Sequence, residues 1–339
     1  MNLELTHPLF WFAALCVGIM GFAIQRGATC TVAAVDEVLS KHAARRLSAL
    51  VEASLWVAGI LLVAQVLGLL SRPPAGYALT QWTVIGGALL GLGAFVNGAC
   101  VFGAIARLGS GQWVYLLTPV GFYIGCLSVE SLFGSPTHPR LNDVSLVLQS
   151  PMWVAGIFIA YVAWRMIRPL WAARPSSPPL RFTERLRQGL TQRIWTPHAA
   201  TTVIGITFAL MLLTAGVWAY TDVLVQLARG KSDNLLLGSA LLIALLLGAI
   251  LGGSSAGRWQ NTPPTVAGAL RCLAGGALMG WGSLLIPGSN DGLILVGMPM
   301  LWPYAWVGFA TMCASIALAQ LWQRHSIWPA RREPANHRL

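Results

Sequence analysis

The stretch "WTVIGGALLGLGAFVNGACVFG", residues 82–103, begins as a membrane helix and breaks before it ends. An apolar run of about 20 residues can cross the hydrocarbon core of a bilayer. Here the run stops at Asn97 and Gly98, and Cys100 and Gly103 follow at the depth where a span should finish. Backbone polar groups in lipid must be satisfied internally, so a broken helix survives only where protein or a water-filled cavity covers it. The stretch therefore predicts an interrupted helix inside a membrane protein.

The composition of the whole chain supports this class. Of 339 residues, 56% are hydrophobic and 10% are charged, against roughly 25% charged in ordinary soluble domains. We predict an all-α polytopic membrane protein of about nine transmembrane helices plus short re-entrant helices. The nine predicted spans are residues 8–25, 48–70, 82–97, 113–133, 151–171, 199–220, 234–252, 266–286 and 302–323.

The net charge of +11 is best explained by membrane topology. With an odd number of spans and the amino terminus outside, most Lys and Arg fall on one face, and cytoplasmic loops collect these residues. We therefore predict the inner (plasma) membrane of a bacterium, with the carboxyl terminus cytoplasmic. Nucleic-acid binding is the poorer explanation because no matching fold signature accompanies the charge.

The chain divides around one long polar interruption. Residues 172–198 contain Pro, Ser and several Arg, which predicts a basic cytoplasmic linker lying against lipid headgroups. It separates a first membrane half, 1–171, whose fifth span is a connector, from a second half, 199–323. Residues 324–339 form a short basic cytoplasmic tail.

Similar short sequence motifs in the two halves suggest that the halves are related. "GALLGLG" at 87–93 recurs as "GALMGWG" at 276–282, and the predicted topology runs these helices in opposite directions. This indicates an inverted repeat, which in transporters places the binding site near the midplane. "GIMGF" at 18–22 and "GAILGG" at 248–253 also look alike, although the topology runs them in the same direction. Either a short re-entrant segment is missing from the nine predicted spans, or that second likeness is accidental.

Three breaks resemble one another: "IQRGATCTV" at 24–32, the stretch at 95–103, and "IPGSNDG" at 286–292. A helix can restart after each, capped by Thr29 or Thr31 in the first and by Ser289 or Asn290 in the third. Helix amino termini bind anions, so converging restarts predict an anion path. The residues predicted to line it are Gln25, Arg26, Cys30, Asn97, Gly98, Cys100, Arg107, Gly288, Ser289, Asn290 and Asp291.

The six cysteines fall into two groups. Cys30 and Cys100 lie in polar breaks at predicted helix amino termini, a position that makes a thiol reactive. A disulfide between them is the less favoured alternative because of the cytoplasmic-side placement. No metal or other cofactor is expected, since no CxxC or metal-ligand spacing occurs. The other cysteines lie in apolar helices, where a thiol packs as a small hydrophobe: Cys16, Cys126, Cys272 and Cys313.

These motifs carry a family resemblance. "GFAIQRGATC" at 21–30, "GLGAFVNGACVFGAIARLGSG" at 91–111 and "LLIPGSNDGLIL" at 284–295 resemble the YeeE/YedE sulfur-transport family over about 8–322. The resemblance implies an hourglass-like arrangement of transmembrane and re-entrant helices. It also implies that thiosulfate passes central cysteines by S–H···S hydrogen bonds without a covalent step, with Cys30 and Cys100 in the relay.

The match has one departure. Thiosulfate carriers of the family use a third cysteine in the second half, where this chain has Ser289. A hydroxyl donates hydrogen bonds as a thiol does, so Ser289 is a candidate substitute. The alternative is a different cargo, such as sulfide, a thiol or a seleno-analogue. Asp291 beside it is either a helix cap or a proton-coupling group, because ionisable residues in the membrane are functional candidates.

Three functions stay open at this point. The favoured one is a transporter or channel for a small sulfur-containing anion, most simply thiosulfate, and not an enzyme. The second is a membrane sulfurtransferase that passes persulfide sulfur to a cytoplasmic carrier protein, and the third is a non-catalytic membrane subunit. No nucleotide-binding loop is present, so ATP does not drive transport on this chain directly.

Two interfacial features complete the predictions. Glu52 is expected to pair with Arg45 and Arg46, which lie nearby in the sequence. Tryptophans near the predicted span ends are typical of the aromatic belts at membrane interfaces. These are Trp82, Trp113, Trp302 and Trp306.

Overall fold

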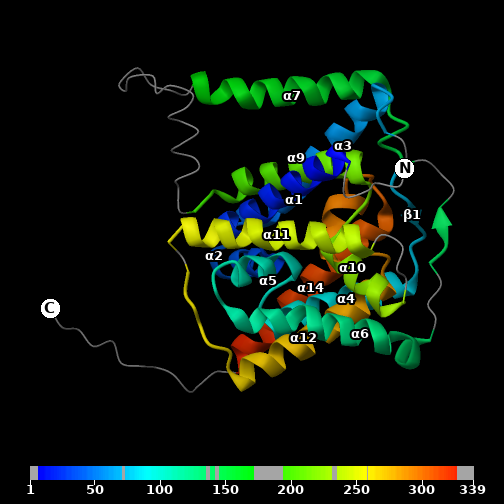
Figure 1. The fold of residues 1–339 in the computed structure, drawn as a ribbon. Helices are drawn as coiled ribbons and strands as arrows, with labels where there is room; N and C mark the ends of the chain where they lie inside the picture. Colours follow the sequence, from blue (N-terminus) through cyan, green and yellow to red (C-terminus); the bar gives the residue numbers. More distant parts are fainter. Residues whose placement is uncertain are drawn as a thin grey trace.

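Helices account for nearly all the regular structure in a computed structural model of the chain (Figure 1). The structure describes residues 7–70, 73–134, 138–141, 145–171, 194–230, 235–257 and 259–326. Most of the predicted linker and nearly all of the predicted tail lie outside the described residues.

The first group of elements runs from the amino terminus to a long outer helix. Strands β1 and β2 pair antiparallel, with Gly76 opposite Leu141, at one end of the helical bundle (Figure 1). The elements are α1 (Pro8–Gly27), α2 (Thr31–Lys41), α3 (Arg45–Val66), β1 (Gly76–Tyr77), α4 (Gln81–Asn97), α5 (Val101–Leu108), the 3-10 turn η1 (Trp113–Leu116), α6 (Leu117–Phe133), β2 (Arg140–Leu141) and α7 (Met152–Trp171).

The second group repeats much of this order. A long helix followed by a short one, then two long helices, a short broken one and a final long helix occur in both groups. The elements are α9 (Pro197–Ala215), α10 (Tyr220–Ala228), α11 (Leu235–Ser255), α12 (Val266–Leu285), α13 (Asn290–Gly292), the π-helical turn η2 (Leu293–Gly297) and α14 (Pro303–Ser326).

The chain is a polytopic α-helical membrane protein. Within the described ranges, seven helical segments are long and apolar enough to span a bilayer, or eight if α12 and the bent segment 290–297, at 49°, form one span. The predicted count of nine is not confirmed. Large apolar side chains face outward, such as Trp11 at 65% and Leu318 at 68% exposure, which is the arrangement expected of helices surrounded by lipid.

Glycines allow α4 and α12 to pack at backbone contact. A Cβ built on Gly93 would lie 2.7 Å from the Gly275 carbonyl oxygen, and one built on Gly282 would lie 2.6 Å from that of Gly86. As residue numbers rise along α4 they fall along α12, so the helices run antiparallel. Small residues at such contacts let membrane helices approach closely. The two similar "GAL" motifs therefore face each other across one interface.

The second pair of similar motifs has a different explanation. A Cβ on Gly248 of α11 would lie 1.9 Å from the Gly18 carbonyl oxygen of α1, and one on Gly252 would lie 3.1 Å from the Phe22 carbonyl oxygen. Residue numbers rise together along this contact, so α1 and α11 run parallel. The motifs at 18–22 and 248–253 are therefore alike because they are packing partners. Helices α1 and α11 are not counterparts in the recurring helix order, because α1 corresponds to α9 and α11 corresponds to α3.

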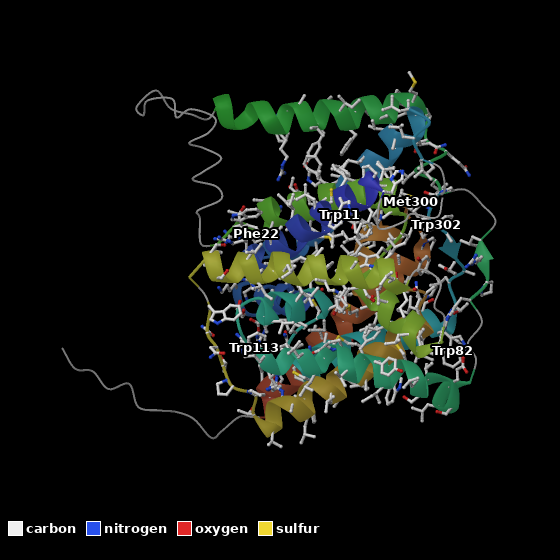
Figure 2. The ribbon with its side chains drawn as sticks, viewed as in Figure 1. Trp11, Phe22, Trp82, Trp113, Met300 and Trp302 are labelled. Atoms are coloured by element: carbon white, nitrogen blue, oxygen red, sulfur yellow. The ribbon has the colours of Figure 1, made fainter. Side chains whose placement is uncertain are left out.

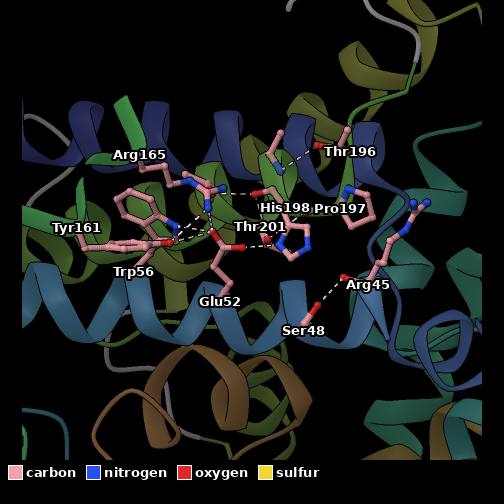
Figure 3. A network of polar contacts seen from close by, with 12 residues as sticks. Arg45, Ser48, Glu52, Trp56, Tyr161, Arg165, Thr196, Pro197, His198 and Thr201 are labelled. Carbon is pink, nitrogen blue, oxygen red and sulfur yellow. Dashed lines mark hydrogen bonds and ion pairs between the residues drawn. The ribbon is translucent and has the colours of Figure 1, made fainter. Parts of the chain in front are cut away.

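Helix α7 lies on the outside of the bundle and is tied to it by a polar network (Figure 3). Glu52 of α3 forms ion pairs with Arg165 of α7 and with His198 of α9. The predicted pairing with Arg45 and Arg46 is wrong. Glu52 lies further along α3, on the side where α7 and α9 contact the helix, so partners distant in sequence reach it first.

The tryptophans divide between the two ends of the bundle, with Trp82 and Trp302 toward one end and Trp113 toward the other (Figure 2). Trp302, however, is only 7% exposed, and its ring packs against Gly76 of β1. It therefore belongs to the protein interior and not to a lipid-facing belt. Trp306 is 38% exposed and fits the belt prediction.

Candidate functional site

The first break lies between α1 and α2. Ala28 ends α1 in the left-handed conformation (φ 46°), and Cys30 is extended (φ −158°) at the N-cap of α2. The predicted caps Thr29 and Thr31 are wrong: Thr31 is already the first helical residue. The left-handed turn at Ala28 moves the restart so that the thiol itself begins the helix.

The second break lies between α4 and α5, and polar side chains hold it. Gly98 takes φ +75°, and Cys100 is the N-cap of α5. The Asn97 side chain donates to the Ala99 carbonyl (2.7 Å) and accepts from the Thr118 hydroxyl (2.9 Å). The Asn97 side chain is thus hydrogen-bonded at both its nitrogen and its oxygen, which holds the carboxyl end of α4 in place.

Arg107 also supports the second break. Its guanidinium donates to the Gly98 carbonyl (3.1 Å) and to the Tyr115 hydroxyl (2.7 Å). The Gly98 carbonyl would otherwise lack an intrahelical partner, as the last carbonyls of a helix do. Arg107 therefore stabilises the interrupted backbone.

The two breaks bring the predicted thiols together. The Thr31 backbone N–H donates to the Cys100 sulfur (3.2 Å), so Cys100 lies beside the residue that follows Cys30. Both cysteines are free, and Cys100 has no exposed surface. A Cβ on Gly103 would lie 2.6 Å from the Cys30 sulfur, so the glycine provides the space that Cys30 occupies. Two helix amino termini thus present adjacent thiols.

Gln25 and Arg26 direct their side chains to neighbouring helices. The Gln25 amide donates to the Ser110 hydroxyl (3.2 Å), and the Arg26 guanidinium donates to the Ser255 hydroxyl (3.0 Å). The guanidinium also lies over the ring of Phe22, 4.9 Å from its centroid. Both predicted path residues are buried and fasten α1 beside the first break.

The third break precedes α13, at a turn where Gly288 takes φ +127°. Ser289 is the N-cap, which is one of the two predicted caps, but its hydroxyl bonds the Asp291 carboxylate and no backbone N–H. The Thr221 hydroxyl of α10 lies 3.1 Å from the Ser289 oxygen and 3.3 Å from an Asp291 oxygen. Asn290 is fully buried, and within the described part of the chain neither polar atom of its amide has a hydrogen-bond partner.

A cavity of about 560 Å³ opens onto Ser289. Its lining includes ionisable side chains from four separate segments of the chain. Burial, together with the Asp291 carboxylate, raises the pKa of Asp222 to about 7; Asp222 lies on α10, which is not among the candidate spans. The ionisable residues of the lining are Tyr77, His138, Arg140, Asp222, Arg229 and Tyr304.

Our sequence-based site prediction included Gly288 and Ser289 of this lining but missed its ionisable residues. Arg140 and Arg229 are two of only four basic residues that the predicted topology leaves on the outer loops. Their departure from the positive-inside pattern is the one signal that could have indicated them. Thr221 and Asp222 had no comparable signal because their role depends on which helix α10 faces.

A narrow apolar region separates the Ser289 turn from the thiols. A cavity of about 10 Å³ there is lined by Asp291, by Tyr220 and by Phe102 and Ile105 of α5, the helix that begins after Cys100. On the other side, Cys30 borders a second cavity of about 10 Å³ with Arg46. The large cavity at Ser289, the small apolar cavity at Asp291 and the thiol pair therefore follow one another along the molecule.

No group of three or more His, Cys, Asp or Glu side chains within the described ranges could hold a metal ion. The arrangement offers hydrogen-bond donors, two thiols and a cavity whose lining includes two arginines. Interrupted helices of this kind are features of membrane transport proteins.

Comparison with known proteins identifies the class further. The sequence model of the family described as Sulphur transport matches residues 26–318, so the chain belongs to this sulphur-transport family, as its motifs predicted. It is similar to the thiosulfate transporter TsuA of Escherichia coli (strain K12), with 22% identity over 329 residues, 89% of this chain and 91% of that protein. It is also similar to the thiosulfate transporter TsuA of Spirochaeta thermophila, with 24% identity over 327 residues, 88% and 94% of the two chains.

Proposed function

We propose that this protein transports thiosulfate across the bacterial inner membrane, relaying it without covalent chemistry past Ser289, Cys100 and Cys30. The observation that carries the proposal is the meeting of the Cys30 and Cys100 thiols at two helix amino termini. The family and the names of the relatives support the cargo. The amino terminus lies outside and the carboxyl terminus in the cytoplasm.

The large cavity is the entrance in this proposal. Arg140 and Arg229 line it together with Asp222, and the two guanidinium groups attract a divalent anion toward the cavity. At its inner end the anion meets Ser289. The Ser289 hydroxyl is a donor of suitable size for the terminal sulfur, which makes it the counterpart of the third cysteine in the family.

The thiol pair is the next station. Phe102 and Ile105 must move aside before the anion reaches Cys100, because the cavity between them holds about 10 Å³, roughly one water-sized probe. At the thiols, S–H groups donate weakly, and the amino termini of α2 and α5 contribute positive partial charge. Arg46, beside the cavity at Cys30, marks the exit. A cytoplasmic sulfur-carrier protein would receive the cargo there.

The two halves, residues 1–171 with α7 as connector and 199–323, are inverted counterparts in this proposal. The recurring helix order and the antiparallel α4–α12 contact support it. Cys100 and Ser289 are then equivalent, because each is the N-cap of the short helix that follows the corresponding long one. The path thus passes the Cys100 thiol at the break of one half and the Ser289 hydroxyl at the break of the other.

Growth on a single sulfur source tests the proposal. A sulfur-auxotrophic bacterial host without its own thiosulfate uptake would express the chain with thiosulfate as the only sulfur source. Growth with the natural sequence, lost in Cys30→Ala, Cys100→Ala and Ser289→Ala, is the expected result. Cys313→Ala is the matched control, because Cys313 lies within the helix α14 and in none of the three breaks. Intact growth of both thiol variants would instead indicate a non-catalytic subunit.

The sulfurtransferase alternative has its own signature. Thiosulfate and a cysteine thiol would give a persulfide and sulfite, which adds the mass of one sulfur atom to Cys30 or Cys100. Mass spectrometry of alkylated protein after exposure to thiosulfate reads this directly. An unmodified mass at both cysteines during active uptake is expected of the non-covalent relay.

A further inference from the structure

Asp291 is a buried carboxylate placed directly behind Ser289. It is 6% exposed, and its oxygens accept hydrogen bonds from the Ser289 hydroxyl, the Thr221 hydroxyl and the Gly292 backbone N–H (3.0 Å). Among the described residues none of these donors is a cation. An ionised carboxylate therefore has hydroxyl and amide partners only.

The hydroxyl hydrogens can be accounted for one by one. A serine or threonine hydroxyl carries one hydrogen to donate. While Asp291 is ionised, Ser289 and Thr221 both use theirs on the carboxylate. The Ser289 oxygen then presents only lone pairs to the large cavity, and a negative charge lies directly behind it. An arriving anion meets an acceptor and a like charge.

Protonation of Asp291 reverses this arrangement. The carboxyl O–H can donate to the Ser289 oxygen, which releases the Ser289 hydrogen to donate into the cavity. The negative charge behind Ser289 disappears in the same step. Binding of a single proton by Asp291 thus converts the position at Ser289 from one that repels an anion into one that binds it.

We propose that Asp291 is the proton-binding residue of the transport path: thiosulfate binds at Ser289 together with one proton, which Asp291 holds. The inference rests on the proposed function and adds its coupling ion. One proton from water in the large cavity is bound per anion bound, and no bond to sulfur forms or breaks. When the anion moves on, Asp291 releases the proton and the hydroxyls return to the carboxylate.

The surroundings favour Asp291 over other titratable groups as the site of the switch. On its inner side the small cavity is apolar apart from Tyr220, and Cys100 lies beyond it. On the outer side Asp222 is the other carboxylate, and Ser289 donates to Asp291 and not to it. The remaining ionisable groups facing this region are His138, Arg140, Arg229, Tyr77 and Tyr304.

Calorimetry of the purified full-length protein in detergent measures the coupling. Sodium thiosulfate would be titrated in buffers of different ionisation enthalpy, which gives the number of protons taken up per anion. We expect close to one for the natural sequence where Asp291 is ionised in the free protein. The affinity then falls about tenfold for each unit of rising pH in that range.

Two variants locate the proton. Asp291→Asn keeps a group that can donate to Ser289 but cannot titrate, so its proton uptake should disappear and its affinity should vary less with pH. Asp222→Asn is the matched control, a carboxylate of the same cavity, and should retain the uptake. A correct size-exclusion profile is required of both variants, and Thr221→Val is the second probe if Asp291→Asn does not fold.

The outcomes separate the two proposals. Binding of thiosulfate by the natural protein with no proton uptake at any pH would overturn the role of Asp291 and leave the transport proposal standing. Proton uptake that is lost in Asp222→Asn and kept in Asp291→Asn would show that Asp222 holds the proton. That result would also overturn the role of Asp291. Absence of thiosulfate binding by the natural protein would refute the proposed function, and this inference with it.

Discussion

Gly103→Ala tests whether the position of the Cys30 thiol matters. Gly103 is the third residue of α5, and the added Cβ would lie 2.6 Å from the Cys30 sulfur, 3.0 Å from the Cys30 Cβ and 3.2 Å from the Ala99 Cβ. Non-bonded carbon atoms prefer about 3.5–4.0 Å. The Cys30 side chain must therefore shift by about 1 Å, while Cys100 at the start of the same helix stays in place.

The stability cost of this substitution is modest and its functional cost is large. Overpacking costs about 1–3 kcal/mol, and replacing a helical glycine by alanine returns about 1 kcal/mol, so the variant should fold. A misplacement of about 1 Å in a reacting arrangement can cost about a hundredfold in rate. We expect thiosulfate uptake to fall by about that factor with little loss of protein.

Initial rates of radiolabelled thiosulfate uptake, normalised to the amount of protein in the membrane, provide the measurement. Gly156→Ala is the matched control, because a Cβ on Gly156 of α7 meets nothing within 4 Å. A rate for Gly103→Ala equal to that of the control would refute the reasoning that the relay depends on where Cys30 lies.

Three further predictions concern the remaining parts of the molecule. Glu52→Gln removes the ion pair with Arg165, which is 33% exposed, so thermal unfolding in detergent should show a loss of about 1 kcal/mol; an unchanged midpoint would contradict a structural role for the network. Gly248→Ala should lower stability by about 3 kcal/mol, because its Cβ would lie 1.9 Å from the Gly18 backbone oxygen. A thermal unfolding midpoint equal to that of Gly156→Ala would contradict close packing of α1 against α11. Arg229→Gln should raise the thiosulfate concentration for half-maximal uptake about tenfold at low salt and by less at high salt; an effect independent of salt would argue against capture by charge.

Several features of this protein could be predicted from single segments of the sequence. Run length and apolarity identified most spans, including the one that ends at Asn97, because the bilayer imposes a length and excludes unsatisfied backbone. The breaks at Cys30, Cys100 and Ser289 were visible for the same reason. Glycine and polar residues at membrane depth violate those constraints unless the protein covers them.

The roles of the polar residues near the breaks could not be predicted in this way. Asn97 and Arg107, which were predicted to line the path, hydrogen-bond the interrupted backbone. Arg140 and Arg229 were counted as topological exceptions and line the entrance cavity. A side chain's type is known from the sequence, but its direction depends on the neighbouring helix that it meets.

The sequence by itself determined that this is a membrane protein with three interrupted helices, because each segment's relation to lipid is encoded in its own residues. Only the tertiary structure decided that the Cys30 and Cys100 breaks meet, that α1 packs parallel to α11, and that Asp291 lies behind Ser289. Contacts between helices in lipid depend on small residues and shape. Such residues occur in nearly every span of this chain, so they permit many pairings and the packed molecule selects one.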